Sequence, residues 1–571
     1  MRENGQALPT GALGTDVPEA RVSLYDTTLR DGTQREGMSL SVADKLRIAR
    51  ELAVLGVDYV EGGWPGSNPK DAEFFRRVRK LELGRTRIAA FGSTRRAGAT
   101  CEHDANIQAL VAAATPVVTV VGKSSVLHVE RVLETTREQN LLMISESVAY
   151  LKALGKEVVY DGEHFFDGFA LDREYTLASV RAAASAGADC VVLCDTNGGS
   201  LPEDVADTVR AVRDELAAAG LPTRIGIHTH NDAGLAVANA LAAVRAGASH
   251  VQGTINGYGE RCGNLDLVPL IANLQLKLGY ACLASEQLRR LTEVSHLVAD
   301  IANLNPDAYA PYVGRSAFAH KGGIHVAAIH KCPGSYEHVE PALVGNETRV
   351  VVSELAGRRN VHMRAAALGL ELNGREHTVL QHIKELESTG FQFEAADGSF
   401  EMLVRRSAPD YHAPFELIDF TALVGKQADG VPCAQVMVRV RVGDVVLHTA
   451  ADAEGPVHAL DRAIRKALVP HYPELSDVHL VDYKVRIIDA HMGTAARPRV
   501  LIESARGEER WSTVGCSANI IEASWQALWD SLELPLLRDR DRDAPGQRPP
   551  ARPVRASSLA PRHSFLHLWG P

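Results

Sequence analysis

Two histidines separated by one residue form the pattern in this chain that most directly suggests chemistry. His228 and His230 follow the apolar run 224–227 and precede an Ala-rich helical pattern over residues 233–248. Side chains alternate along a strand with a period of two, so both imidazoles lie on one face. Two imidazoles at a strand end suit a divalent metal ion. A hydrogen-bonded histidine pair at a loop mouth is the alternative that this pattern alone leaves open.

Further polar groups follow other strand-like runs in the same way. They are Arg30 and Asp31 after the run 22–29, Glu61 in the run 59–63, and Asn264 in a Gly-rich loop after the run 250–255. Each has an ordinary explanation by itself, as a local ion pair, a solvated carboxylate or a turn residue. In a barrel of parallel strands, however, all the C-terminal strand ends meet at one mouth. Together with the two histidines, these groups predict one polar site there.

The elements that must position these groups alternate between strand-like and helical patterns. The strand-like runs cover residues 22–29, 59–63, 87–92, 117–121, 157–160, 190–194, 225–230 and 250–255. Helical patterns follow most of them, and eight such units within roughly 260 residues predict a (β/α)8 barrel. A doubly wound open sheet is the main alternative, and the lack of a Gly-rich dinucleotide turn disfavours it.

The composition excludes several classes of protein. The 571 residues are 45% hydrophobic and 23% charged, with a formal net charge of -10. This mild acidity disfavours a nucleic-acid partner. No apolar run approaches the ~18 residues that span a membrane, and residues 1–19 lack the apolar core of a signal peptide. Eight cysteines without a Cys-x-x-Cys pair favour the reduced cytoplasm over a disulfide scaffold.

Changes of pattern divide the chain into five predicted segments. A disordered leader at 1–20 precedes the barrel domain at 21–283, and a helical linker subdomain that contributes to the active site follows at 284–410. Within 411–537, alternating strands followed by a helix occur twice, and this imperfect duplication suggests an α+β binding or regulatory domain. The tail at 538–571 alternates in charge, then becomes rich in Pro and Arg, and is expected to be disordered.

Several stretches resemble one enzyme family. They are DTTLRDG at 26–32, HTHND at 228–232 and GERCGN at 259–264. On these residues the chain is similar to the 2-isopropylmalate, homocitrate and citramalate synthases, the Claisen-condensing members of a metal-dependent barrel superfamily. The resemblance covers residues 22–535, including a C-terminal segment similar to that family's regulatory, dimer-forming domain.

Further stretches resemble the citramalate synthases within that family. They are LRDGTQREG at 29–37, EGGWPGSNP at 61–69, DGEHFFDG at 161–168 and CDTNGG at 194–199. Typical isopropylmalate synthases tend to have Glu where Thr33 stands and Phe where Trp64 stands. This difference disfavours the isopropylmalate branch of the family.

The resemblance implies a metal centre at the barrel mouth. Asp31, His228 and His230 match the family's metal ligands, and Asn264 matches a further ligand or near-ligand. Imidazole, carboxylate and amide groups suit Mg²⁺, Mn²⁺ or Zn²⁺. Such an ion would chelate a 2-oxo acid and polarise its keto group as a Lewis acid.

Other residues match groups that handle the substrates. The resemblance implies that Arg30 stabilises negative charge on the enolate or the new alkoxide, and that Glu61 orients Arg30. Thr196 matches a hydroxyl that contacts the substrate carboxylate. These three residues would bind and orient the oxo acid.

The condensation also needs a base that removes a proton from the methyl group of acetyl-CoA. His325 matches the family's catalytic histidine, and Tyr336 matches a tyrosine that assists acid–base or hydrolysis steps. Glu163 is a candidate to pair with His325 and tune its basicity. Structural polar contacts are the alternative for all three side chains.

The implied reaction joins acetyl-CoA, pyruvate and water into (R)-citramalate and CoA, an entry step to isoleucine biosynthesis. The nearest alternative is the same chemistry on 2-oxoisovalerate, which gives 2-isopropylmalate. A lyase resembling HMG-CoA lyase and a non-catalytic amino-acid sensor are more distant alternatives. We expect a homodimer, with isoleucine as a feedback ligand of the domain at 411–537.

Overall fold

The computed structural model describes residues 20–353, 356–426, 430–488 and 490–543. These residues form two compact units, one of residues 20–319 and 337–349, the other of residues 320–336 and 350–543. Apart from its last residue, the leader expected at 1–20 lies outside the described residues.

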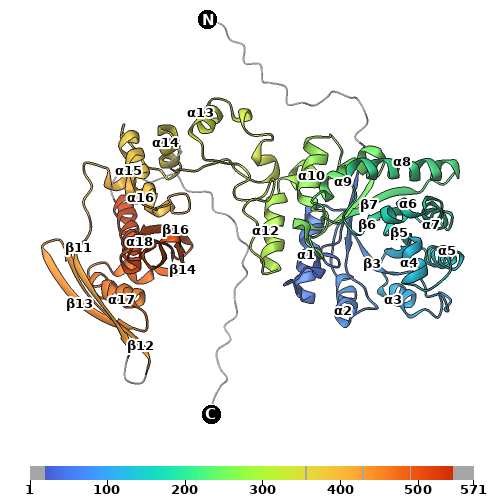
Figure 1. The fold of residues 1–571 in the computed structure, drawn as a ribbon, viewed down its shortest axis with the longest axis horizontal. Helices are drawn as coiled ribbons and strands as arrows, with labels where there is room; N and C mark the ends of the chain where they lie inside the picture. Colours follow the sequence, from blue (N-terminus) through green and yellow to red (C-terminus); the bar gives the residue numbers. More distant parts are fainter. Residues whose placement is uncertain (1–19, 354–355, 427–429, 489, 544–571) are drawn as a thin grey trace, which may run out of the picture. The chain divides into compact units, whose positions relative to one another are not determined.

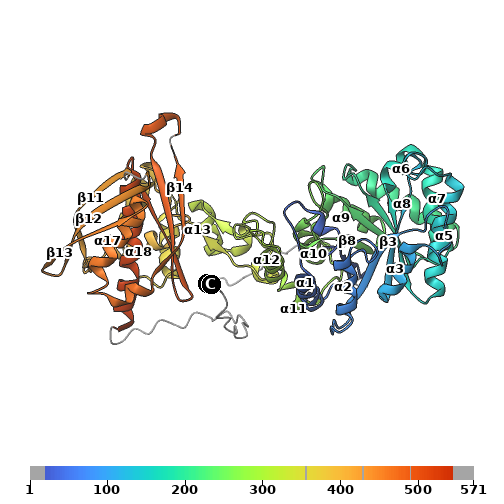
Figure 2. The same cartoon turned by 90° about the horizontal axis from the view of Figure 1, so that it is seen from below.

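Eight parallel strands close into a barrel in the first unit, and they follow one another around it in chain order. They are β1 (Ser23–Asp26), β2 (Tyr59–Glu61), β3 (Arg87–Ser93), β4 (Val117–Lys123), β5 (Glu157–Glu163), β6 (Cys190–Asp195), β7 (Arg224–Thr229) and β8 (His250–Gly253). Helices surround the strands in both views (Figure 1, Figure 2). The predicted α/β fold with a (β/α)8 barrel is therefore confirmed.

The helices of the barrel begin and end at local signals in the sequence. They are α1 (Val42–Leu55), α2 (Pro69–Val78), α3 (Ala105–Ala113), α4 (Val126–Arg131), α5 (Arg137–Ala153), α6 (Phe165–Leu171), α7 (Arg173–Ser185), α8 (Pro202–Ala218), α9 (Ala236–Ala246) and α10 (Leu267–Leu276). In α1, the Ser41 hydroxyl accepts from the Asp44 amide at 3.2 Å, and the Asp44 carboxylate accepts from the Ser41 amide at 2.9 Å. This reciprocal pair satisfies amides that the first turn leaves without partners.

The barrel strands are buried on both faces, which explains their nearly continuous apolar sequences. Inside the barrel, Tyr25, Tyr59, Val117 and Val159 form a packed apolar layer. This layer fills the middle of the barrel, and the polar side chains of the candidate site lie beyond it, toward the C-terminal mouth.

The first unit extends beyond the boundary that we predicted at residue 283. Helices α11 (Ser285–Leu288) and α12 (Leu291–Ile301) belong to it, and α12 packs against α1. Val294 and Val298 of α12 are buried in the same apolar core as the barrel helices. The apolar stripe of α12 needs a partner surface, and the barrel helices provide it.

The second unit begins with helices that have an apolar core of their own. They are α13 (Gly323–Lys331), α14 (Arg358–Ala367), α15 (Glu376–Ser388) and α16 (Asp397–Arg406), with the two-residue strands β9 (Ala319–His320) and β10 (Arg349–Val350) nearby in the chain. Val361, Val379, Ile383 and Phe400 lie in that core. This region corresponds to the predicted helical subdomain.

Two three-stranded antiparallel sheets follow, each with a long helix after its last strand. The first contains β11 (Glu416–Lys426), β12 (Pro432–Val442) and β13 (Val445–Ala453), followed by α17 (Pro456–Leu468). The second contains β14 (His479–Ile487), β15 (Pro498–Arg506) and β16 (Glu509–Cys516), followed by α18 (Ile520–Asp543). Helix α17 packs on the first sheet and α18 on the second. The duplication read from the sequence is present.

Helix α18 continues past the predicted end of the domain at residue 537. Its last turns carry alternating charges that pair with the domain beneath them: Arg538 contacts Glu401 at 2.5 Å and Glu509 at 2.6 Å. Asp539 pairs with Arg506 at 2.5 Å. The charges that suggested disorder in the sequence instead hold residues 538–543 in the helix, so the predicted boundary is too early.

The eight cysteines all lie within the described residues, and none of them forms a disulfide there. Among the described residues, no helix is long and apolar enough to cross a membrane.

Candidate metal centre and active site

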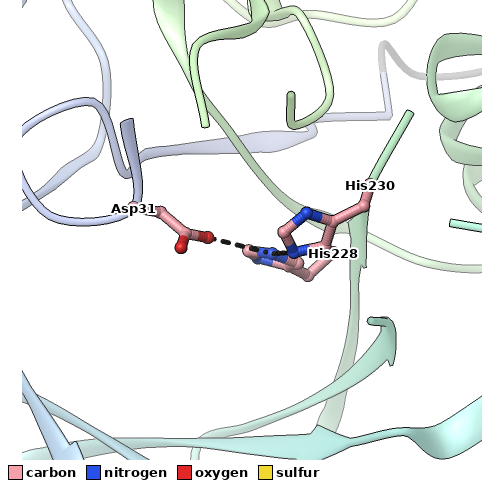
Figure 3. Close-up of side chains that lie close together, drawn as sticks. All are labelled: Asp31, His228 and His230. Carbon is pink, nitrogen blue, oxygen red and sulfur yellow. Dashed lines mark hydrogen bonds and ion pairs between the residues drawn. The ribbon is translucent and has the colours of Figure 1, made fainter. Parts of the chain in front are cut away.

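Strand β7 places two imidazoles at the C-terminal mouth of the barrel. His228 lies in the strand and His230 directly follows it, and both side chains are buried. Their Nε2 atoms are 3.3 Å apart, and their ring centroids are 5.2 Å apart. The shared face predicted from the period-two spacing is therefore present, and Figure 3 shows both rings turned toward the same space.

Asp31 and Asn264 complete the group from loops that follow β1 and β8. The Asp31 Oδ2 atom lies 3.2 Å from His228 Nε2 and accepts a hydrogen bond from Asn264 Nδ2 at 2.7 Å. One donor atom from each of Asp31, His228 and His230 lies within 4.8 Å of the others (Figure 3). The Asn264 Oδ1 atom is buried without a hydrogen-bond partner in the protein.

These donor atoms fit a divalent cation. Two imidazole nitrogens 3.3 Å apart can share only one hydrogen bond, and together with the Asp31 carboxylate they converge on a space where a cation could bind all three groups. The buried Asn264 Oδ1 is a further oxygen without a protein partner, and such atoms normally have one. Two imidazoles with carboxylate and amide oxygens form a ligand set for Mg²⁺, Mn²⁺ or Zn²⁺.

The pKa shifts at two of the three cluster residues, Asp31 and His230, fit a metal site. At His228, burial opposes protonation, but the neighbouring Asp31 carboxylate outweighs it and raises the pKa of the ring. Burial opposes ionisation of Asp31, but the neighbouring Arg30 guanidinium outweighs it and holds the pKa of Asp31 below its usual range. Burial, then the neighbouring His228, lowers the pKa of His230 to about 4. An ionised carboxylate and a neutral imidazole are the forms that bind metal ions.

Arg30 is held on three sides beside this cluster. Its Nε donates to Glu61 at 2.5 Å, its Nη1 donates to Asp31 at 2.9 Å, and its guanidinium carbon lies 3.8 Å from the centre of the Phe91 ring. Glu61 also accepts from the Tyr25 hydroxyl at 2.7 Å. The contact between Glu61 and Arg30 that the resemblance implied is present, and Tyr25 and Phe91 add supports that we did not predict.

Thr196 and Glu163 also line the cavity at this mouth. The cavity has a volume of about 530 Å³, and its lining includes Arg30, Asp31, Trp64, Phe91, His228 and His230. The Thr196 hydroxyl oxygen accepts from the His164 amide at 2.9 Å, which leaves its hydrogen free to donate. Glu163 forms an ion pair with Lys123.

His325 and Tyr336 lie in the second unit rather than in the barrel. Their rings stack with centroids 4.2 Å apart and planes inclined by 25°, and both side chains are exposed. Their catalytic roles, and the pairing of Glu163 with His325, stay predictions.

Three further residues around the cluster had no role predicted from the sequence. Gln252 on β8 contacts His228, and Asp161 on β5 contacts Gln252. A polar residue within the buried run 250–253 was the available signal for Gln252. Arg261 pairs with Asp232 through two bonds of 2.8 and 2.9 Å and donates to the Thr196 carbonyl at 2.8 Å. It thereby ties together the loops after β6, β7 and β8.

Comparison with known families covers most of the chain. A family described as HMGL-like matches residues 21–298, a homocitrate synthase post-HMGL domain-like family matches residues 312–390, and a LeuA allosteric (dimerisation) domain matches residues 394–535. The matches follow the barrel, the helical region and the duplicated sheets in order.

Curated relatives match along nearly their full length. The (R)-citramalate synthase of Geobacter sulfurreducens is 48% identical over 91% of this chain and 98% of its own. The (R)-citramalate synthase of Synechocystis sp. is 50% identical over 89% of this chain and 95% of its own. That of Aquifex aeolicus is 48% identical over 91% of this chain and 99% of its own. With the barrel-mouth cluster and the three matched domains, these relatives show that the chain belongs to the (R)-citramalate synthase family.

Proposed function

We propose that this chain condenses acetyl-CoA with pyruvate and water to give (R)-citramalate and CoA, an acyl transfer in which the acyl group becomes an alkyl group. The observation that carries the proposal is the buried Asp31–His228–His230 cluster beside Arg30, inside the barrel-mouth cavity. The identity to curated (R)-citramalate synthases supports pyruvate as the oxo acid.

A divalent metal belongs to this proposal. Asp31, His228 and His230 would hold it, with the Asn264 Oδ1 as a further oxygen ligand. Mg²⁺ and Mn²⁺ are the first candidates, and Zn²⁺ also suits the imidazole pair. When bound, the ion would supply Lewis-acid polarisation of the keto group of the oxo acid.

The side chains of the barrel would bind and orient the oxo acid. The Thr196 hydroxyl, whose oxygen already accepts from a backbone amide, would donate its hydrogen to the substrate carboxylate. The Arg30 guanidinium would stabilise negative charge as it develops on the former keto oxygen. Glu61, Tyr25 and Phe91 hold that guanidinium in one orientation, so it needs no rearrangement during the reaction.

The carbon–carbon bond forms between the acetyl methyl carbon and the keto carbon of pyruvate. His325 would take the methyl proton, and Tyr336 and Glu163 would assist in proton transfer. The new alkoxide gains a proton, and water then cleaves the thioester into a carboxylate and CoA. The cleavage releases a stable thiol and makes the sequence effectively irreversible.

The test is CoA release by the purified enzyme with acetyl-CoA, Mn²⁺ or Mg²⁺, and a panel of 2-oxo acids. We expect turnover on pyruvate well above turnover on 2-oxoisovalerate, and none in His230→Ala under the same conditions. The reverse preference would make the enzyme a 2-isopropylmalate synthase. No release from metal-loaded protein with either acid would contradict the proposal.

We also propose a homodimer regulated by isoleucine through the duplicated domain. Support comes from the LeuA allosteric (dimerisation) match over residues 394–535. Millimolar isoleucine should lower the rate or raise the melting temperature, with leucine as the comparison ligand. An unchanged rate and melting temperature would remove isoleucine as the effector.

The free cysteines fit a reducing compartment, and we propose the cytoplasm as the location of this protein.

A further inference from the structure

A polar pair lies in the barrel core behind the metal cluster and has no part in the steps above. Gln252 on β8 is fully buried, and Asp161 on β5 is 3% exposed. Burial, then the neighbouring Glu61, raises the pKa of Asp161 to about 7. A carboxyl group in this position costs folding free energy, so its contacts call for a physical explanation.

The two side chains form a chain of hydrogen bonds that ends on a metal ligand. Gln252 Nε2 donates to Asp161 Oδ1 at 2.9 Å, and Gln252 Oε1 lies 2.8 Å from His228 Nδ1. The chain joins three strands, β5, β8 and β7, and β5 and β8 are not neighbours in the barrel. The contact between Asp161 and Gln252 therefore crosses the barrel interior.

The direction of each bond follows from the acceptor at the far end. The amide nitrogen of Gln252 faces Asp161, and an ionised Asp161 can only accept this bond. The amide oxygen then faces His228, which can meet it only with a hydrogen on Nδ1. With Nδ1 protonated, the lone pair of the neutral His228 ring stands on Nε2. That is the atom that lies near Asp31 and His230.

We propose that Asp161 and Gln252 are positioning residues that fix the Nδ1–H tautomer and the ring orientation of His228 for metal binding. The inference rests on the proposed function, since it takes Asp31, His228 and His230 as the metal ligands. Partners that orient a ligating histidine in this way typically contribute 10–100-fold to metal affinity.

The primary test is Mn²⁺ binding to the purified full chain, measured by titration calorimetry without substrates. Gln252→Met and Gln252→Leu should each raise the Mn²⁺ Kd by about 10–100-fold. The matched control is Gln275→Met. The Gln275 amide also makes two hydrogen bonds within the first unit, to the backbone of Leu283 at 2.8 and 3.2 Å, away from the cluster. This variant should keep the wild-type Kd.

Substitutions at Asp161 separate its acceptor role from its charge. Asp161→Asn keeps an oxygen that accepts from Gln252 Nε2, so its Mn²⁺ Kd should stay within about threefold of wild type. Asp161→Leu removes the acceptor and should raise the Kd by about tenfold, at the lower end of the range for such partners. Equal weakening by both substitutions would mean that the charge, rather than the hydrogen bond, matters, and would overturn this part of the proposal.

A spectroscopic readout reports on the tautomer itself. In ¹⁵N-histidine-labelled protein loaded with diamagnetic Mg²⁺, His228 should show a protonated Nδ1 in wild type and in Asp161→Asn. The signal of the protonated Nδ1 is assigned to His228 by its absence from the spectrum of His228→Gln. In Gln252→Met, this signal should change.

Two outcomes would overturn the proposal while leaving the proposed function intact. One is a wild-type Mn²⁺ Kd and tautomer in both Gln252 variants. The other is an equal loss of affinity in Gln275→Met, which would indicate a general loosening of the barrel. Failure of the wild-type protein to bind Mn²⁺ or Mg²⁺ would instead contradict the metal centre on which the proposed function rests.

Discussion

Arg30 is constrained by three neighbouring side chains at the site. Its guanidinium contacts two carboxylates, Glu61 and Asp31, and its central carbon lies 3.8 Å from the centre of the Phe91 ring. A planar fork with several donors can make these contacts together, whereas an ammonium group is a point charge on a flexible stem. The chemistry at this residue therefore depends on orientation as much as on charge.

Arg30→Lys should lower kcat by about 100–1000-fold, the range for losing one oriented donor to a developing oxyanion. The melting temperature should change little, because the positive charge beside Glu61 and Asp31 is kept. Arg35→Lys is the control: Arg35 is exposed, with its guanidinium 5.3 Å from the centre of the Tyr258 ring, and should keep kcat within about twofold. A kcat near wild type in Arg30→Lys would show that a positive charge at this position is sufficient for catalysis and that the orientation of the guanidinium is not required.

His250 makes the stability of the barrel depend on pH. Both ring nitrogens are buried without hydrogen-bond partners, and the ring packs beside those of Tyr25 and Tyr59. Burial, then the positive charge of Arg224, lowers the pKa of His250 to about 3. The folded state therefore holds this ring neutral, while the unfolded chain takes up a proton near pH 6.5. Its contribution is complete above pH 6.5 and is lost as the pH falls toward 3.

From pH 8 to pH 5, wild type should lose about 2 kcal/mol of unfolding free energy that His250→Phe does not lose. Urea unfolding at the two pH values measures the difference, and comparison within each protein cancels any packing change from the new ring. Equal pH slopes in the two proteins would mean that His250 is not held neutral.

At the scale of elements, the end of helix α18 depends on contacts made by residues after 537, the domain end predicted from the sequence. Arg538 pairs with Glu401, whose side chain is 3% exposed, and Asp539 pairs with Arg506. Glu401 also pairs with Arg405 at 2.8 Å, so loss of Arg538 would leave it with one partner. The charged end of the helix therefore stabilises the region that includes α16.

A chain that ends at residue 537 should lose roughly 2 kcal/mol of stability in the second unit, less than the 3–5 kcal/mol for breaking an isolated buried ion pair, because Arg405 remains. A chain that ends at residue 543 should keep wild-type stability. Chemical denaturation of both truncated proteins measures the effect, and Arg538→Met in the full chain isolates the ion pair. Equal stability of the two truncated chains would support the domain end predicted at residue 537.

At the scale of the whole molecule, the proposed metal centre would link distant parts of the barrel. Its candidate ligands come from strand β7 and from the loops after β1, β7 and β8, which meet only when the barrel closes. A metal bound by all of them therefore binds the folded barrel and not the unfolded chain. Metal binding and barrel stability are coupled for this reason.

Mn²⁺ at 100 times its Kd should stabilise the barrel by about 2.7 kcal/mol and raise its melting temperature. The increase should be reversed by a chelator and absent in His230→Ala and Asp31→Ala. A thermal melt followed by circular dichroism measures it. An equal increase in these variants would place the stabilising metal elsewhere in the protein.

The sequence by itself determined the barrel, the duplicated C-terminal domain and the residue types at the candidate metal centre. Apolar periodicity and polar strand ends are local properties, and parallel strands bring all such ends to one mouth. The tertiary structure alone decided which side chains support that centre. The bond between Asp161 and Gln252 crosses the barrel between strands that are not neighbours. Such contacts depend on closure and register, which no local spacing encodes, and the ion pairs that extend α18 depend equally on residues distant in the chain.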